Sequence, residues 1–189
     1  MNKHTSIYYP PGGILIWFLI ILEIFTFLGG IMVFLTYRND EPILFHEAQQ
    51  QLNPLVGTIN TVVLIISGYF IANALTFIKT NQQQKAANAI LISLGLGVVF
   101  LIIKSTEYYL KINEGIGFTE NTFFTFYWMM TGFHFIHVLF GIGLLSYMYL
   151  GIKKNTYHAD NYFDVETSAT YWHLCDLIWI LIFPIFYLI

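Results

Sequence analysis

The stretch Ile14–Tyr37, ILIWFLIILEIFTFLGGIMVFLTY, contains a single acidic or basic side chain, Glu23. A bilayer hydrocarbon core about 30 Å thick is crossed by about 20 residues, since an α-helix rises about 1.5 Å per residue. The prolines and glycines of 10–13 suit the start of a helix, and the polar segment 38–42 ends the run. The stretch therefore predicts a transmembrane helix that is retained, because it exceeds a signal-peptide core and lacks a small-residue cleavage site.

Four further apolar runs of similar length follow, separated by polar segments. Only 10% of the chain is charged, against about 25% in an ordinary soluble domain, and 57% is hydrophobic. The sequence predicts an all-α fold, an integral membrane bundle of five transmembrane helices in a single membrane domain over 1–189. The expected spans are about 14–37, 55–78, 86–110, 122–152 and 165–188.

Cysteine content and charge exclude several classes of protein. Cys175 is the only cysteine, so this chain builds no disulfide or multi-cysteine metal site by itself. The net charge is −3 and no basic stretch is long enough to indicate nucleic-acid binding. The expected partners are membrane phospholipid and other membrane subunits, and no nucleic acid.

The distribution of basic residues predicts the orientation in the membrane. Cytoplasmic loops carry an excess of lysine and arginine. The basic residues on the side of the N-terminus are Lys3, Lys79, Lys85, Lys153 and Lys154, and those on the other side are Arg38 and Lys111. We therefore expect a cytoplasmic N-terminus and an external, periplasmic C-terminus.

Five ionisable residues fall deep within the expected spans: Glu23, His134, His137, His173 and Asp176. From the helical rise, each of them lies about 12–22 Å from the end at which the chain enters its span. Ionisable groups in lipid are costly and usually face protein. One hypothesis is a proton-holding interhelical cluster of all of these except His134. The simpler interpretation is that they join the helices by hydrogen bonds worth about 0.6 kcal/mol each.

Two of these histidines raise the question of a metal site. His134 and His137 are three residues apart and so project from one side of a helix. A haem or copper centre needs further ligands at matching depth, and the remaining membrane histidine, His173, has a carboxylate rather than another histidine pair beside it. We therefore expect no metal ligands in this chain.

A second polar group lies near the outer end of the third span. Lys104 and Glu107 are one helical turn apart, which favours an ion pair or a lysine that snorkels to the interface. Tyr108 belongs with an aromatic belt at the membrane surface. Glu107, Tyr108 and Trp172 are our candidates for contact with a lipid headgroup or a partner subunit.

Several sequence motifs resemble those of a known family. The segment 52–55, LNPL, is followed by Glu-Tyr-Tyr at 107–109, by TGFHFIHV at 131–138 and by YWHLCDLIW at 171–179. In this order the motifs are similar to those of subunit III of haem-copper oxidases, including its short bacterial form. Glu23 falls where that family keeps an intramembrane glutamate.

The resemblance implies a supporting role rather than a reaction site. The long form of the family has two more N-terminal helices, which enclose phospholipid, and this chain has no room for them. By resemblance, the chain is a non-catalytic subunit beside oxidase subunits I and II in the bacterial cytoplasmic (inner) membrane. Haem and copper belong to the partner subunits and no cofactor to this chain, although it can bind phospholipid. Its role is to support the stability and proton uptake of subunit I during oxygen reduction.

Two alternative functions are consistent with the same residues. The ending 179–188 is similar to subunit-III-like accessory proteins of nitric oxide reductases. Buried glutamate, histidine and aspartate are also typical of a stand-alone proton transporter, although the five spans show no obvious inverted repeat.

Overall fold

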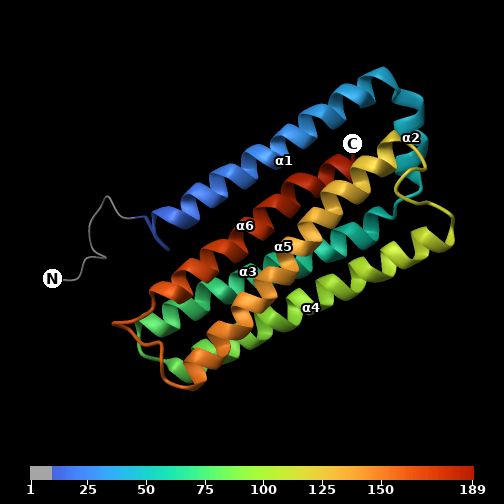
Figure 1. Cartoon of the computed structure of the whole chain (residues 1–189). Coiled ribbons are helices and arrows are strands. Elements are labelled where there is room, and N and C mark those ends of the chain that lie inside the picture. The colour runs from blue at the N-terminus through green and yellow to red at the C-terminus, as the bar shows by residue number, and fades with distance from the viewer. Residues whose placement is uncertain (1–9) are drawn as a thin grey trace.

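A computed structural model describes residues 10–189, so Lys3, used above for the orientation, lies outside the described residues. Within this range the chain forms six α-helices and no β-strand. They are α1 (Ile14–Asp40), α2 (Pro42–Gln50), α3 (Pro54–Lys79), α4 (Gln83–Asn113), α5 (Thr122–Lys153) and α6 (Phe163–Tyr187). Figure 1 shows the five long helices running side by side, with α2 at one end.

All helices except α2 are long and apolar enough to cross a membrane. The predicted all-α class with five transmembrane helices is therefore confirmed. Helix α2 differs from the polar connection expected between the first two spans. It forms because Pro42 suits the first helical turn and because Phe45 and Ala48 are buried against the bundle. The segment thus caps one end of the core.

The long helices do not share their contacts equally. Helices α3 and α4 form a closely packed antiparallel pair, and α5 and α6 pack on them. Helix α1 packs on α5 and α6 and on the short α2, and lies at the edge of the bundle in Figure 1. Much of α1 is apolar and exposed, including Leu15, Phe18 and Phe25, as suits a helix that faces lipid or another membrane subunit.

Close packing at the centre depends on small residues around one tryptophan. Trp172 of α6 is fully buried, and its indole Nε1 donates to the hydroxyl of Ser67 at 3.1 Å. A Cβ atom on Gly97 would lie 2.6 Å from this ring, and one on Gly141 would lie 2.9 Å from it. The two glycines therefore let α4 and α5 approach the indole closely.

The connection between α5 and α6 is anchored by Tyr157. Its ring lies against Gly151 so closely that a side chain there would clash, and its hydroxyl lies 3.4 Å from the carboxylate of Asp164. Burial, reinforced by the charge of Asp164, raises the pKa of Tyr157 to about 12. The phenol therefore stays neutral throughout the physiological range.

The start of α3 gives a first testable prediction. Asn53 caps this helix, and its side-chain oxygen accepts from the backbone N–H groups of Leu55 at 3.0 Å and Val56 at 3.4 Å. Replacing such a cap with alanine costs about 1 kcal/mol. We expect Asn53→Ala to lower the free energy of unfolding in detergent by that amount, measured by circular dichroism. Asn39→Ala, at an exposed position with no capping role, is the control, and an equal loss in both variants would contradict the assignment.

Candidate functional site

One polar pair of the membrane region joins α1 to α5. Glu23 Oε1 lies 3.2 Å from Nε2 of His137, and both side chains are mostly but not fully buried. The second carboxylate oxygen of Glu23 is buried without a hydrogen-bond partner. The two residues are far apart in the sequence, and their contact follows from the similar depths of the two positions in neighbouring helices.

The geometry requires a proton between these two groups. Nδ1 of His137 lies 2.8 Å from the backbone carbonyl of Phe133, and a carbonyl only accepts hydrogen bonds. Nδ1 therefore carries a hydrogen, and in a neutral imidazole Nε2 is then an acceptor. The contact with Glu23 forms only if the carboxyl is protonated or the imidazole is doubly protonated. Either way, the pair holds one exchangeable proton.

The pair lies one helical turn from a crevice between α1 and α5. The crevice has a volume of about 210 Å³ and is almost entirely apolar. Phe27 and Phe133 stack on each other in its wall, with ring centroids 5.5 Å apart. The proton-holding pair therefore lies on the outer side of the bundle, between α1 and α5, rather than in its sealed centre.

A second pair lies within one turn of α6. His173 Nδ1 lies 3.3 Å from Asp176 Oδ2; the histidine is half-exposed, whereas the aspartate is buried. The aspartate carboxylate touches Gly68 of α3, where any side chain would collide with it. The glycine thus lets α3 pass directly over the carboxylate.

The residues of the hypothesised cluster thus lie in two separate pairs. Within residues 10–189, no hydrogen bond or ion pair connects Glu23 or His137 with His173 or Asp176. One pair connects α1 with α5, and the other faces α3. The helical rise predicts similar depths for these residues, but it gives no information on how far apart they lie around the bundle axis.

His134 lies apart from both pairs. Its side chain is fully buried, and neither ring nitrogen has a hydrogen-bond partner in the described part of the chain. The ring stacks on Trp179, with centroids 5.3 Å apart, and meets the edge of Phe100 at 5.7 Å. Aromatic packing therefore holds this ring, without a hydrogen bond from the described residues.

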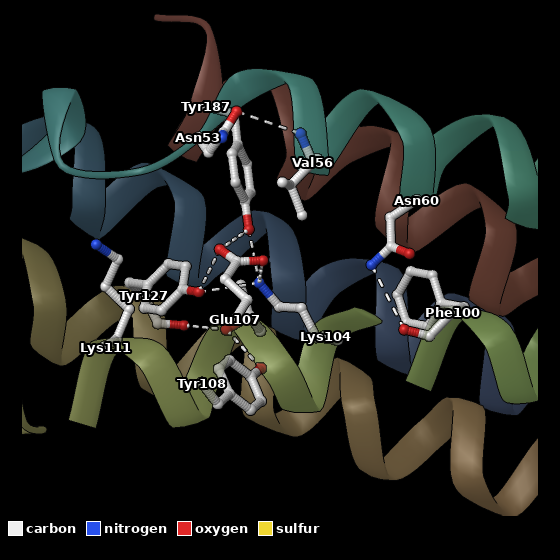
Figure 2. Close-up of polar contacts among 12 residues, drawn as sticks. Asn53, Val56, Asn60, Phe100, Lys104, Glu107, Tyr108, Lys111, Tyr127 and Tyr187 are labelled. Atoms are coloured by element: carbon white, nitrogen blue, oxygen red, sulfur yellow. Dashed lines mark hydrogen bonds and ion pairs between the residues drawn. The ribbon is translucent and has the colours of Figure 1, made fainter. Parts of the chain in front are cut away.

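The largest polar network was only partly foreseen in the sequence. Lys104 and Glu107 form the expected ion pair, at 3.2 Å, but the lysine does not snorkel to the interface because it is fully buried. Its Nζ also lies 3.0 Å from the hydroxyl of Tyr127 and 2.6 Å from that of Tyr187. Both phenols donate to Glu107 Oε1, at 2.7 and 2.6 Å (Figure 2). The network ties α4, α5 and α6 together.

The three candidates for lipid or subunit contact differ in their access to the surface. Trp172 is enclosed by the chain's own helices, as described above. Tyr108 is partly buried, and its hydroxyl lies 2.9 Å from that of Thr131. Glu107 is also largely buried, and its carboxylate is bound by its neighbours, yet it lines an open groove at the end of α4.

No set of three or more histidine, cysteine, aspartate or glutamate side chains in 10–189 is arranged to hold a metal ion. The free thiol of Cys175 is buried. The contacts of the two pairs are suited to proton holding and to hydrogen bonding by side chains.

Fold and site together define a multi-pass helical membrane protein with polar pairs at membrane depth. A family model described as cytochrome c oxidase subunit III matches residues 13–189. The chain belongs to the cytochrome c oxidase subunit III family, which confirms the resemblance found in its motifs.

Individual relatives bear the same name. Cytochrome c oxidase subunit 3 of Synechocystis sp. is 30% identical over 171 residues, which cover 90% of this chain and 72% of the relative. The proteins of that name from Rhipicephalus sanguineus and Felis catus are 36% and 34% identical, over 71% and 72% of this chain. The chain spans about half the length of these two animal relatives.

Proposed function

We propose that the chain is the non-catalytic third subunit of a haem-copper respiratory oxidase and associates with oxidase subunits I and II. Membership of the family and the names of its relatives support this assignment over a nitric oxide reductase accessory protein. Haem and copper belong to the partner subunits in this proposal. The chain itself carries no electrons and affects oxygen reduction only through the subunit that it contacts.

The observation that carries the proposed role is the contact between Glu23 and His137. It holds one exchangeable proton at membrane depth, on the outer side of the bundle between α1 and α5. Helix α1 is also the least buried of the five long helices. With α1 against subunit I, the pair supplies protons to the uptake surface of that subunit and keeps it from inactivating during sustained turnover.

The proposed location is the bacterial cytoplasmic membrane, with the N-terminus inside and the C-terminus on the periplasmic side. The lysines that support this orientation within the described residues are at one end of the bundle. Lys79 ends α3, Lys85 lies in the first turn of α4, and Lys153 ends α5 with Lys154 directly after it. Their excess over Arg38 and Lys111 follows the positive-inside rule.

A substitution at Glu23 tests this role. Glu23→Gln keeps the size of the side chain but removes the carboxyl group that exchanges the proton. In the purified oxidase complex, we expect normal assembly and a normal initial rate of oxygen consumption. As turnover continues, we expect proton uptake and oxygen consumption to decline together, with fewer turnovers before inactivation, measured in vesicles with a pH-sensitive dye and an oxygen electrode.

Glu120→Gln is the matched control, since this carboxylate is exposed outside the helices. It should leave both quantities unchanged. Proton uptake and turnover lifetime in Glu23→Gln equal to those of the wild type, across the pH range, would reduce the pair to a packing contact.

A further inference from the structure

The carboxylate of Glu166, in the first turn of α6, joins three segments at one end of the bundle. Its Oε1 accepts from the ammonium of Lys79, the last residue of α3, at 2.9 Å, and its Oε2 accepts from the backbone N–H of Gly12 at 3.1 Å. Gly12 lies just before α1, and the starts of α1 and α6 lie at the same end of the bundle in Figure 1. The side chain of Glu166 is only 17% exposed, so solvent screens these contacts less than those of a fully exposed pair.

The chain before α1 lies directly against the backbone of α6. The carbonyl of Gly12 accepts from the hydroxyl of Thr167 at 3.0 Å, so consecutive residues of α6 bind both backbone polar groups of Gly12. The φ of Gly12 is +74°, and a Cβ atom there would lie 3.0 Å from the Cα atom of Thr167. Glycine suits both this backbone conformation and so close an approach. The contact therefore fixes the point at which α1 starts.

The same contact restrains the rotation of α1. Trp17, in the first turn of α1, donates from its indole to the carbonyl of Pro11 at 3.0 Å, which ties the helix to the segment that α6 holds. Apolar side chains of α1, such as Ile16 and Ile20, are buried against the bundle, but apolar contacts are non-directional. Hydrogen bonds prefer narrow ranges of distance and angle, so those of Gly12 restrain the orientation of α1 more sharply.

The rotation of α1 decides where its glutamate points. Helix α1 is the least buried of the five long helices, and it packs on α5, α6 and the short α2. Glu23 lies about three helical turns after Gly12. Because a helix of that length turns as a unit, a rotation at its start would carry the carboxyl of Glu23 away from Nε2 of His137, which now lies 3.2 Å from it.

We infer that Glu166 is a positioning residue for the proton-holding pair: through Gly12, it holds α1 in the rotation that brings Glu23 to His137. The ion pair with Lys79 orients the Glu166 carboxylate toward Gly12, and a charged acceptor makes the stronger hydrogen bond. The consequence for oxygen reduction rests on the proposed function, whereas the effect on the pair is measured on this chain alone.

Nitrogen NMR of the histidine rings tests the positioning. The full chain is produced with isotope-labelled histidine and reconstituted in bilayers, and the ring signal of His137 is assigned by its loss in His137→Gln. Glu23→Gln gives the signal of His137 without a carboxyl beside it. We expect Glu166→Ala to move the His137 signal most of the way to that position. The signals of His134 and His173 should stay where they are in the wild type, which shows that the bundle remains folded.

Two further variants separate this effect from a general one. Thr167→Val removes the other hydrogen bond to Gly12 and keeps the shape of the side chain, so it should move the His137 signal in the same direction by less. Asp160→Ala removes an exposed carboxylate at the same end of the bundle and should match the wild type. An unmoved His137 signal in Glu166→Ala, or equal movement of all three histidine signals in Glu166→Ala and Thr167→Val, would overturn the positioning role.

A charge swap distinguishes the bond to Gly12 from the ion pair. Lys79→Glu combined with Glu166→Lys restores opposite charges on α3 and α6, but a lysine cannot accept from the N–H of Gly12. The His137 signal should therefore stay displaced in the double variant. A return to its wild-type position would assign the effect to the ion pair and overturn the role of Gly12.

Turnover of the oxidase complex tests the consequence separately. Glu166→Ala should shorten the turnover lifetime as Glu23→Gln does, and the combination of the two should be no worse than either alone. A shortened lifetime in Glu23→Gln but not in Glu166→Ala would overturn the positioning role. Wild-type lifetimes in both single variants, with the His137 signal displaced in Glu166→Ala, would contradict the proposed function and support the positioning of the pair.

Discussion

Lys104→Met is expected to lower the free energy of unfolding by about 3–5 kcal/mol, the typical cost of removing one partner from a buried ion pair. The ammonium is fully buried and meets Glu107 and the hydroxyls of Tyr127 and Tyr187. Methionine fills nearly the same space but leaves the carboxylate of Glu107 without its cation. The loss is measured as the shift of thermal and denaturant unfolding in detergent, followed by circular dichroism.

A double variant distinguishes the charge from the packing. Lys104→Met combined with Glu107→Leu removes both charges and should recover most of the loss, since an apolar replacement of a buried pair is often neutral. Lys154→Met, at an exposed position after α5, is the control and should unfold like the wild type. A Lys104→Met protein as stable as the control would show that the buried network contributes little to folding.

Trp172→Ala is expected to destabilise the bundle by a similar amount, about 3–5 kcal/mol, because it leaves a large cavity between rigid helices. The indole is fully buried, fills the space between Gly97 and Gly141, and donates to Ser67. The two glycines have no side chains that could move into the cavity and fill part of it. Denaturant titration in detergent micelles measures the effect.

Leu177→Ala provides the matched comparison, since Leu177 lies on the same helix but is 43% exposed to the surroundings of the bundle. It should cost much less than Trp172→Ala. Trp172→Phe should fall between the two, because phenylalanine keeps part of the ring volume and loses the hydrogen bond. If the two alanine variants unfold alike, Trp172 does not organise the core.

The sequence predicted the transmembrane helices well because membrane insertion imposes a simple rule. A span needs about 20 apolar residues, and runs such as 14–37 and 165–188 meet it without help from tertiary contacts. The contact of Glu23 with His137 was also within reach, since both had been assigned to membrane depth in different helices. Their pairing follows once α1 lies beside α5.

Other features depend on how the helices are rotated, which the sequence does not state. His134 and His137 lie on the same helix, yet one ring packs on Trp179 and the other meets Glu23. The two phenols beside Lys104 come from positions 127 and 187, and no local pattern links them to that lysine. Helix α2 was missed because its helical signal is short and follows a cluster of polar residues.

Co-purification tests the central claim most directly. The tagged chain is extracted from its native membrane in gentle detergent, and whatever accompanies it is identified by mass spectrometry and by an optical haem spectrum. We expect oxidase subunits I and II, haem absorption and oxygen-consuming activity. Nitric oxide reductase subunits in their place, or a colourless protein without partners that conducts protons alone in liposomes, would contradict the assignment to an oxidase.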